Sequence, residues 1–184
     1  MPILTLQPNG TDGKDASIES VAQANNNFQT DPRFVCGTYI LTNGNARALA
    51  EFDLSSIPAG SVINSATITL TCENYYTTIT VYIHRITASW LENTVTYNNQ
   101  PAHDATADAS LSVSSVGAKD FSVTALVQEW IDGTANYGFK IIGSSEGTGS
   151  LTGSNFDSSD FGTAGSRPKI VIDYTPPSNF FLMF

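Results

Sequence analysis

Two alternating stretches joined by a corner, at residues 47–70, constrain the fold of this chain more than any other feature. The segment reads RALAEFDLSSIPAGSVINSATITL. Apolar side chains occupy one parity at Ala48, Ala50 and Phe52, and after the corner they occupy positions 66, 68 and 70, between threonines. Ser, Pro and Gly at 55–60 separate the two stretches. Alternation with period two is typical of strands that bury one face, so the segment predicts strand, turn and strand.

The rest of the chain extends this pattern to an all-β domain. A length of 184 residues suits one domain that can bury a full core. Charged residues make up only 14%, with Ser, Thr, Asn and Gly in their place, which favours a turn-rich β protein. Strands are predicted at 3–7, 16–19, 34–36, 47–53, 65–73, 78–85, 121–123, 137–142 and 169–174. Short strands separated by polar turns predict a sandwich of two sheets.

Two segments depart from the strand pattern. Residues 124–133 carry apolar side chains at helical spacing, which predicts one short helix, with Thr124 as N-cap and Gly133 just beyond its end. Residues 144–165 are rich in Gly, Ser, Thr and Asp. They predict a loop or an irregular hairpin, held to the body by Phe156 and Phe161.

Charge and hydropathy exclude several classes of function. The net charge is −9 and Lys and Arg form no cluster, so neither nucleic acid nor an anionic membrane surface is an expected partner. No run approaches the roughly 20 apolar residues of a membrane-spanning helix. The first residues lack the basic start and apolar run of a signal peptide. If Met1 is the natural start, the expectation is a chain not exported by the general route.

The two cysteines, Cys36 and Cys72, both fall in predicted strands. The preferred interpretation is two small buried side chains, with a disulfide in an oxidising compartment as the open alternative. Without a Cys-x-x-Cys or Cys/His cluster, a zinc site is not expected.

Several separated blocks together resemble DNRLRE-type domains. They are the segment at 47–70, ITASWLENTVTYNNQPA at 86–102, FSVTALVQEWIDGTANYGFKIIGSSEG at 121–147 and SRPKIVIDY ending at Tyr174. The resemblance implies a jelly-roll β-sandwich of two antiparallel sheets over residues 1–175. It also implies a kinship with carbohydrate-binding modules, structural Ca²⁺ in related sandwiches, and a usual place as non-catalytic pieces of secreted bacterial or archaeal chains.

The segment 176–184 lies outside that pattern. It reads PPSNFFLMF, and its five large apolar residues are Phe180, Phe181, Leu182, Met183 and Phe184. Burial of such side chains contributes about 1.5–3 kcal/mol each, so a docking surface is expected. That surface lies either on the same domain or, as the sharper hypothesis, on a neighbouring subunit or another protein; disorder is the third alternative.

Ligand candidates come from loop aromatics and loop acids. Tyr39, Tyr75 and Tyr76 are candidates for stacking on sugar rings, while Trp90 and Trp130 are expected to be core or corner residues. Acids that could hold a structural Ca²⁺ lie in two loops, and the alternative is that they are solvated turn residues. These acids are Asp12 and Asp15 in the first loop and Asp157 and Asp160 in the second.

No arrangement of residues indicates catalysis. His84 is expected on the surface or in the second sheet, and His103 in a polar loop. The acids show no spacing that selects a pair for glycoside hydrolysis, and no nucleophile elbow is present. The chain is therefore expected not to be an enzyme.

The functional expectation combines the resemblance with the apolar end. We expect a non-catalytic structural or decoration protein of an extracellular particle, such as a phage or virus virion, anchored through residues 180–184 to other protein subunits. Glycan binding is compatible with that role. The alternative is a secreted carbohydrate-binding or adhesion module of a larger bacterial or archaeal surface protein. Polysaccharide is the expected non-protein partner, on a virion or extracellular surface.

Overall fold

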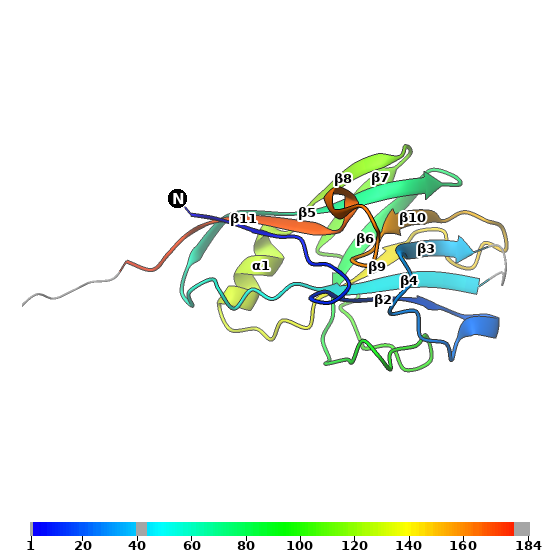
Figure 1. The fold of residues 1–184 in the computed structure, drawn as a ribbon, viewed down its shortest axis with the longest axis horizontal. Helices are drawn as coiled ribbons and strands as arrows, with labels where there is room; N and C mark the ends of the chain where they lie inside the picture. The colour runs from blue at the N-terminus through cyan, green and yellow to red at the C-terminus, as the bar shows by residue number, and fades with distance from the viewer. Residues whose placement is uncertain (1, 40–43, 179–184) are drawn as a thin grey trace, which may run out of the picture.

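The computed structural model describes residues 2–39 and 44–178, which fold into a curled antiparallel β-sandwich with one short α-helix (Figure 1). Eleven strands lie in the described part. They are β1 (Ile3–Leu6), β2 (Lys14–Glu19), β3 (Arg33–Tyr39), β4 (Gly44–Glu51), β5 (Val62–Tyr75), β6 (Ile79–Arg85), β7 (Ala109–Val113), β8 (Gly117–Ser122), β9 (Phe139–Gly143), β10 (Ser154–Asp157) and β11 (Lys169–Thr175). The helix α1 spans Thr124–Ile131, and 3₁₀ turns lie at Val21–Gln23 and Ala164–Ser166.

The predicted all-β sandwich is confirmed, and its two sheets are joined through one strand. One sheet contains β1, β11, β5, β10 and β3, with β8 on the other side of β5. The second contains β2, β4, β9, β6 and β7. Strand β3 pairs with β10 through residues 33–36 and with β4 through residues 37–39, so it belongs to both. Gly37 lies at this transition with φ of +105°, and a Cβ there would come within 2.9 Å of the Cα of Gly153.

The alternation at 47–70 forms the core between the sheets. Ala48, Ala66, Ile68 and Leu70 are fully buried in the main apolar cluster, and the corner at 52–61 connects β4 to β5. A smaller apolar cluster lies on the outer face of the second sheet, between β2, β4 and the segment at 86–95; its members are Ala16, Ile18, Leu49, Ile86, Trp90 and Val95. Strand β4 is therefore buried on both faces.

Helix α1 covers one end of the sandwich, hereafter the helix end. Leu126, Val127 and Trp130 are its buried residues, and Gly133 follows it with φ of +110°, as a C-terminal stop requires. The predicted N-cap is wrong, because Val123 holds that position and the Thr124 hydroxyl instead accepts a hydrogen bond from the Ala66 N–H at 3.0 Å.

The segment at 144–165 contains an element that the sequence did not indicate. Strand β10 lies between β3 and β5, and residues 153–159 are all buried. Phe156 is fully buried, as predicted, and Phe161 is half-buried. Serine, asparagine and aspartate disfavour strands by propensity, but here pairing on both sides and burial override that preference. Strand β7 was also not predicted.

Both cysteines are buried and free. Cys36 and Cys72 belong to the main apolar cluster, and burial raises the pKa of the Cys36 thiol to about 12. The interpretation as small apolar side chains is confirmed, and the disulfide alternative is wrong. Within the described ranges, no helix is long and apolar enough to cross a membrane.

Candidate functional site

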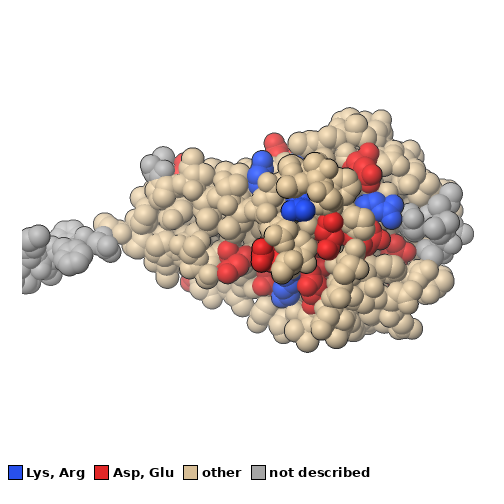
Figure 2. Space-filling view, in the orientation of Figure 1, with Lys and Arg blue, Asp and Glu red and all other residues tan. Residues whose placement is uncertain are grey.

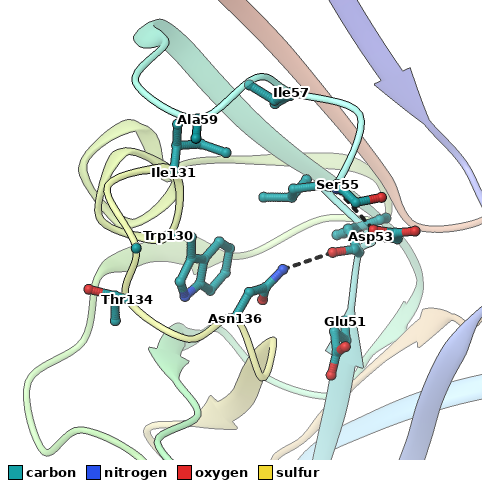
Figure 3. Close-up of a pocket in the computed structure, with 12 residues that line it drawn as sticks. Glu51, Asp53, Ser55, Ile57, Ala59, Trp130, Ile131, Thr134 and Asn136 are labelled. Atoms are coloured by element: carbon teal, nitrogen blue, oxygen red, sulfur yellow. Dashed lines mark hydrogen bonds between the residues drawn. The ribbon is translucent and has the colours of Figure 1, made fainter.

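A cavity of about 440 Å³ opens at the helix end, between the corner after β4 and the residues that follow α1. We call it the helix-end cavity. Its lining residues come from two segments, 51–59 and 130–136 (Figure 3). In this view Glu51 and Asp53 lie on one side, Thr134 and Ile131 on the other, and Trp130 and Asn136 between them. The lining thus combines apolar surface with a few polar groups, which is typical of small-molecule and carbohydrate sites.

The Asn136 side chain holds the two sides of this cavity together. The Asn136 amide donates to the Phe52 carbonyl at 2.9 Å and accepts from the Gly138 N–H at 2.9 Å. Gly138 has φ of +79°, and a Cβ there would lie 2.1 Å from the Ala50 carbonyl oxygen. Only glycine permits this close approach of the 134–138 loop to β4.

Two acids, Glu51 and Asp53, line the helix-end cavity. Asp53 accepts the Ser55 N–H at 2.9 Å, and this hydrogen bond holds the pKa of the Asp53 carboxyl below its ordinary value. Glu51 forms an ion pair with Lys14 at 2.5 Å. Carboxylates of this kind accept hydrogen bonds from hydroxyl groups.

Trp130 forms part of the floor of the cavity but does not present an open stacking face. It is only 7% exposed, and its indole Nε1 is buried with no hydrogen-bond partner. Trp90 is equally buried, and its Nε1 donates to the Tyr137 carbonyl at 2.9 Å. The expectation that both tryptophans are core or corner residues is confirmed.

The predicted tyrosines lie at the opposite end of the sandwich. Tyr75 ends β5 and Tyr76 follows it, with exposed fractions of 36% and 38%. We call this end the tyrosine end. Tyr39 ends β3 at the same end, and its side chain lies outside the described residues. Whether these tyrosines bind glycans stays a prediction.

The two acidic loops proposed for Ca²⁺ do come together. The Asp15 carboxylate accepts the Ser159 N–H at 3.1 Å, and a Cβ at Gly10 would clash with Asp160. Burial raises the pKa of Asp15 to about 7 and that of Asp157 to about 6. Over residues 2–39 and 44–178, however, no three His, Cys, Asp or Glu side chains are arranged to hold a metal ion.

Of these four acids, Asp12 has its partner within its own loop, since its carboxylate accepts a hydrogen bond from the Asn9 amide at 3.0 Å. Calcium at these residues therefore stays a prediction, without support from the carboxylate geometry.

The two histidines belong to a second polar region, the Lys140 cluster, under the segment at 86–108. Lys140 of β9 is fully buried, and its Nζ donates to Gln100 Oε1 at 2.9 Å and to the Pro101 carbonyl at 2.7 Å. It also lies 3.3 Å from Nδ1 of His103, whose ring packs edge-on against His84 at 5.2 Å. Since Lys can only donate, neutral His103 accepts through Nδ1.

Burial explains the acid–base properties of the Lys140 cluster. It lowers the pKa of Lys140 to about 8, and burial together with the nearby lysine charge lowers the pKa of His103 to about 4. His84, on β6 of the second sheet as expected, is buried, and its Nδ1 lies 2.9 Å from the Asp104 carbonyl. These groups do not line the cavities at the helix end.

The fold and the lining of this cavity suit a class of protein that holds sugars on a β-sandwich, and the sequence comparison agrees. Residues 9–174 match the profile of a family of carbohydrate-binding modules. The chain belongs to carbohydrate-binding module family 96. No curated protein matches it. The predicted kinship with carbohydrate-binding modules is thereby confirmed, while the DNRLRE-type resemblance itself stays a prediction.

The sequence pattern did not predict the helix-end cavity. Its walls are about 80 residues apart along the chain, although the segment at 121–147 that contains Trp130 and Asn136 was recognised as a family block. A usable signal was that the corner at 52–60 and the residues that follow α1, 132–138, are both rich in turn residues.

Proposed function

We propose that this protein is a non-catalytic module that binds polysaccharide in the helix-end cavity. The family match over residues 9–174 supports carbohydrate binding, and carbohydrate-binding modules as a class bind sugars without cleaving them. The observation that supports the location is the cavity itself, which is about 440 Å³ in volume and is lined by Glu51, Asp53, Thr134 and Asn136. Their oxygens and amide suit sugar hydroxyls, and the apolar lining suits ring C–H groups.

A carbohydrate panel with two sets of variants tests this proposal. The wild-type chain is screened against soluble polysaccharides, and the best ligand is then titrated by calorimetry. Thr134→Trp fills the mouth of the helix-end cavity, and we expect it to lower the affinity at least tenfold. The variants Tyr75→Ala and Tyr76→Ala alter the tyrosine end and should leave the affinity within twofold.

Thr134 is exposed, so its replacement should leave the free energy of unfolding nearly unchanged, and a thermal melt of each variant provides the control. A loss of binding in the tyrosine variants, with no effect of Thr134→Trp, would move the site to the tyrosine end. Repeating the thermal melt with CaCl₂ and with EDTA tests the Ca²⁺ prediction, because a cation bound only by the folded state raises the melting temperature.

We also propose that residues 180–184 attach the module to an extracellular particle such as a virion, or to another protein surface. These residues lie outside the described part. What supports the proposal is their apolar sequence and the exposure of residues 175–178, which lead away from the sandwich (Figure 1). Deletion of 180–184 should abolish assembly measured by analytical ultracentrifugation and leave carbohydrate binding intact; unchanged assembly would remove this proposal.

A further inference from the structure

We infer that residues 180–184 of one copy of this chain dock into the helix-end cavity of a second copy, and that two copies exchange these segments in a symmetric dimer. The inference rests on the proposed attachment through residues 180–184, and it adds the partner and the surface that receives them. It is carried by the place where the chain leaves the sandwich, by the apolar wall of the cavity, and by the low charge around both.

The described chain leaves the sandwich beside the helix-end cavity. A Cβ placed on Gly60 would lie 3.9 Å from the Cβ of Pro177, and Gly60 directly follows Ala59 of the cavity lining. Residues 179–184 extend at most about 20 Å further, at roughly 3.3–3.6 Å per residue. A cavity that they reach therefore lies at the helix end, on the same copy or on a copy whose helix end faces it.

The direction in which the chain leaves favours a second copy. Pro176 and Pro177 hold their own φ near −65° and keep the residue before each of them extended. Residues 175–178 are all exposed and lead away from the sandwich (Figure 1). This outward course presents the apolar run, which starts at Phe180, to a facing molecule and not to the cavity of its own chain.

The wall of the cavity that continues from this exit is apolar. Its residues include Ile57, Ala59 and Ile131, which lie together in Figure 3, at the end of the cavity away from Glu51. Ala59 is exposed and Ile131 is half-buried, so apolar surface is open to solvent there. Five large apolar side chains at 180–184 complement such a wall, because burial of apolar surface on both partners favours association.

The distribution of charge permits two helix ends to face each other. Residues 176–184 carry no charged side chain, so docking along the apolar wall leaves Asp53 and the Lys14–Glu51 ion pair in solvent. On the face shown in Figure 2, charged side chains gather over the middle of the molecule, and the end from which residues 175–178 leave is mostly uncharged. The net charge of −9 repels a second copy at long range, so added salt should tighten the dimer.

The shared location of the exit and the cavity accounts for the symmetry. Two copies related by a two-fold axis at their helix ends can exchange residues 180–184 reciprocally, so every segment and every cavity is used and assembly stops at two. The exchanged segments also exclude polysaccharide from the helix-end cavity, so dimerisation and carbohydrate binding oppose each other.

Sedimentation velocity over a range of concentrations tests the dimer. Deletion of 180–184 removes the segment, and Ala59→Trp and Thr134→Trp each fill the mouth of the cavity at an exposed position. Val116→Trp, at a residue 58% exposed and outside the lining of the cavity, is the matched control. A thermal melt of each variant establishes that it is folded.

We expect the wild type and Val116→Trp to form a reversible dimer, and the deletion and both cavity variants to raise its dissociation constant at least tenfold. The decisive sample is a mixture of the deletion variant with Ala59→Trp. Each is monomeric alone, but together they should form a one-to-one dimer, because one supplies the open cavity and the other supplies the segment. The deletion should also raise the apparent affinity for the best soluble polysaccharide of the carbohydrate panel.

A monomeric wild type overturns the inference, as docking of the segment on its own chain would give. Oligomers that grow beyond two copies overturn it too, and so does a mixture that stays monomeric at concentrations a hundredfold above the dissociation constant of the wild type. If the deletion abolishes assembly but Ala59→Trp and Thr134→Trp do not, the inference fails and the attachment through residues 180–184 stands. Absence of binding across the carbohydrate panel would instead refute the proposed polysaccharide site, without changing these results.

Discussion

The helix-end cavity and the Lys140 cluster both contain polar groups, but they differ in their accessibility to solvent and ligands. Lys140 and His103 carry large pKa shifts and are enclosed by Gln100, Pro101 and the rest of the segment at 86–108. Asp53, in the lining of the helix-end cavity, is exposed, and its hydrogen bond from the Ser55 N–H lowers its pKa. Perturbed pKa values often mark functional sites, but structural networks perturb them as well. In this protein solvent accessibility, and not the size of a pKa shift, distinguishes the proposed binding surface from the scaffold.

The largest effect that would sharpen this comparison is expected from Lys140→Met. The substitution keeps the length of the side chain but leaves the buried Pro101 carbonyl and His103 Nδ1 without a donor. We expect the free energy of unfolding to fall by about 3 kcal/mol, because one member of a buried network is removed. Urea denaturation measures the loss.

Carbohydrate affinity of Lys140→Met, measured at a temperature where the variant is folded, should equal that of the wild type. Lys169→Met, on the accessible strand β11, is the matched control and should change stability by less than about 1 kcal/mol. A Lys140 variant that folds normally and binds no sugar would contradict the assignment of the Lys140 cluster to the scaffold and of the helix-end cavity to binding.

Asp53→Ala should show the reverse behaviour. Removing this carboxylate deletes charge-assisted hydrogen bonds to sugar hydroxyls, each of which contributes about 1.5–3 kcal/mol, so the affinity for a neutral oligosaccharide should fall at least tenfold. The melting temperature should change little, because Asp53 is exposed and its only described bond is to Ser55. Calorimetry and a thermal melt on the same sample measure both quantities. Equal losses of stability and affinity would contradict the comparison.

The difference in stability between the wild type and His103→Gln, followed as a function of pH, should report on the Lys140 cluster. The pKa of His103 is near 4 in the folded chain, below its unfolded value of about 6.5, so protonation favours unfolding. Its contribution to stability is complete above pH 6.5 and is lost as the pH falls toward 4. The difference in melting temperature between the wild type and His103→Gln should therefore shrink or reverse over that range.

The comparison with His103→Gln cancels the opposite trend of Asp15, whose pKa is raised to about 7 and whose stabilising effect is lost as the pH rises. Binding through Asp53, in contrast, should not change between pH 7 and pH 5, since the pKa of that carboxyl is lowered. A pH-independent difference between the two proteins would show that His103 does not titrate as its surroundings indicate.

The smallest effect is expected from Asp53→Asn. The amide oxygen can still accept from the Ser55 N–H and from a sugar hydroxyl, so neutral ligands should weaken only a few-fold. Removing one negative charge should shift the ratio of the affinities for a uronate and a neutral oligosaccharide of equal length toward the uronate. Competition titrations with one neutral and one uronate oligosaccharide measure the ratio. An unchanged ratio would show that the negative charge of Asp53 does not determine which ligand is preferred.

The local sequence pattern predicted the strands and the helix better than it predicted the helix-end cavity. Alternation at 47–70 and helical spacing at 124–133 are short-range signals, so the strands, the corner and α1 were predicted correctly. Strand β10 was missed because Ser154, Asn155 and Asp157 look like loop residues until two neighbouring strands bury them. The helix-end cavity and the partners of Lys140 could not be predicted, because each joins segments some 40 to 80 residues apart.

The pairing of the first and last strands has a mechanical consequence. Ile3 of β1 opposes Asp173 of β11, and the Tyr174 N–H bonds to the Pro2 carbonyl at 3.2 Å, so both ends of the described chain leave at one point of the sandwich. Tension applied between residues 2 and 178 would pull β1 away from β11 and break their hydrogen bonds one at a time. The hydrogen bonds of an antiparallel pair are perpendicular to the strands, so this force acts on the end bond first. Tension applied between residue 178 and a ligand in the helix-end cavity would instead put no load on β1. This module should therefore resist force best when it is held at only one of its ends.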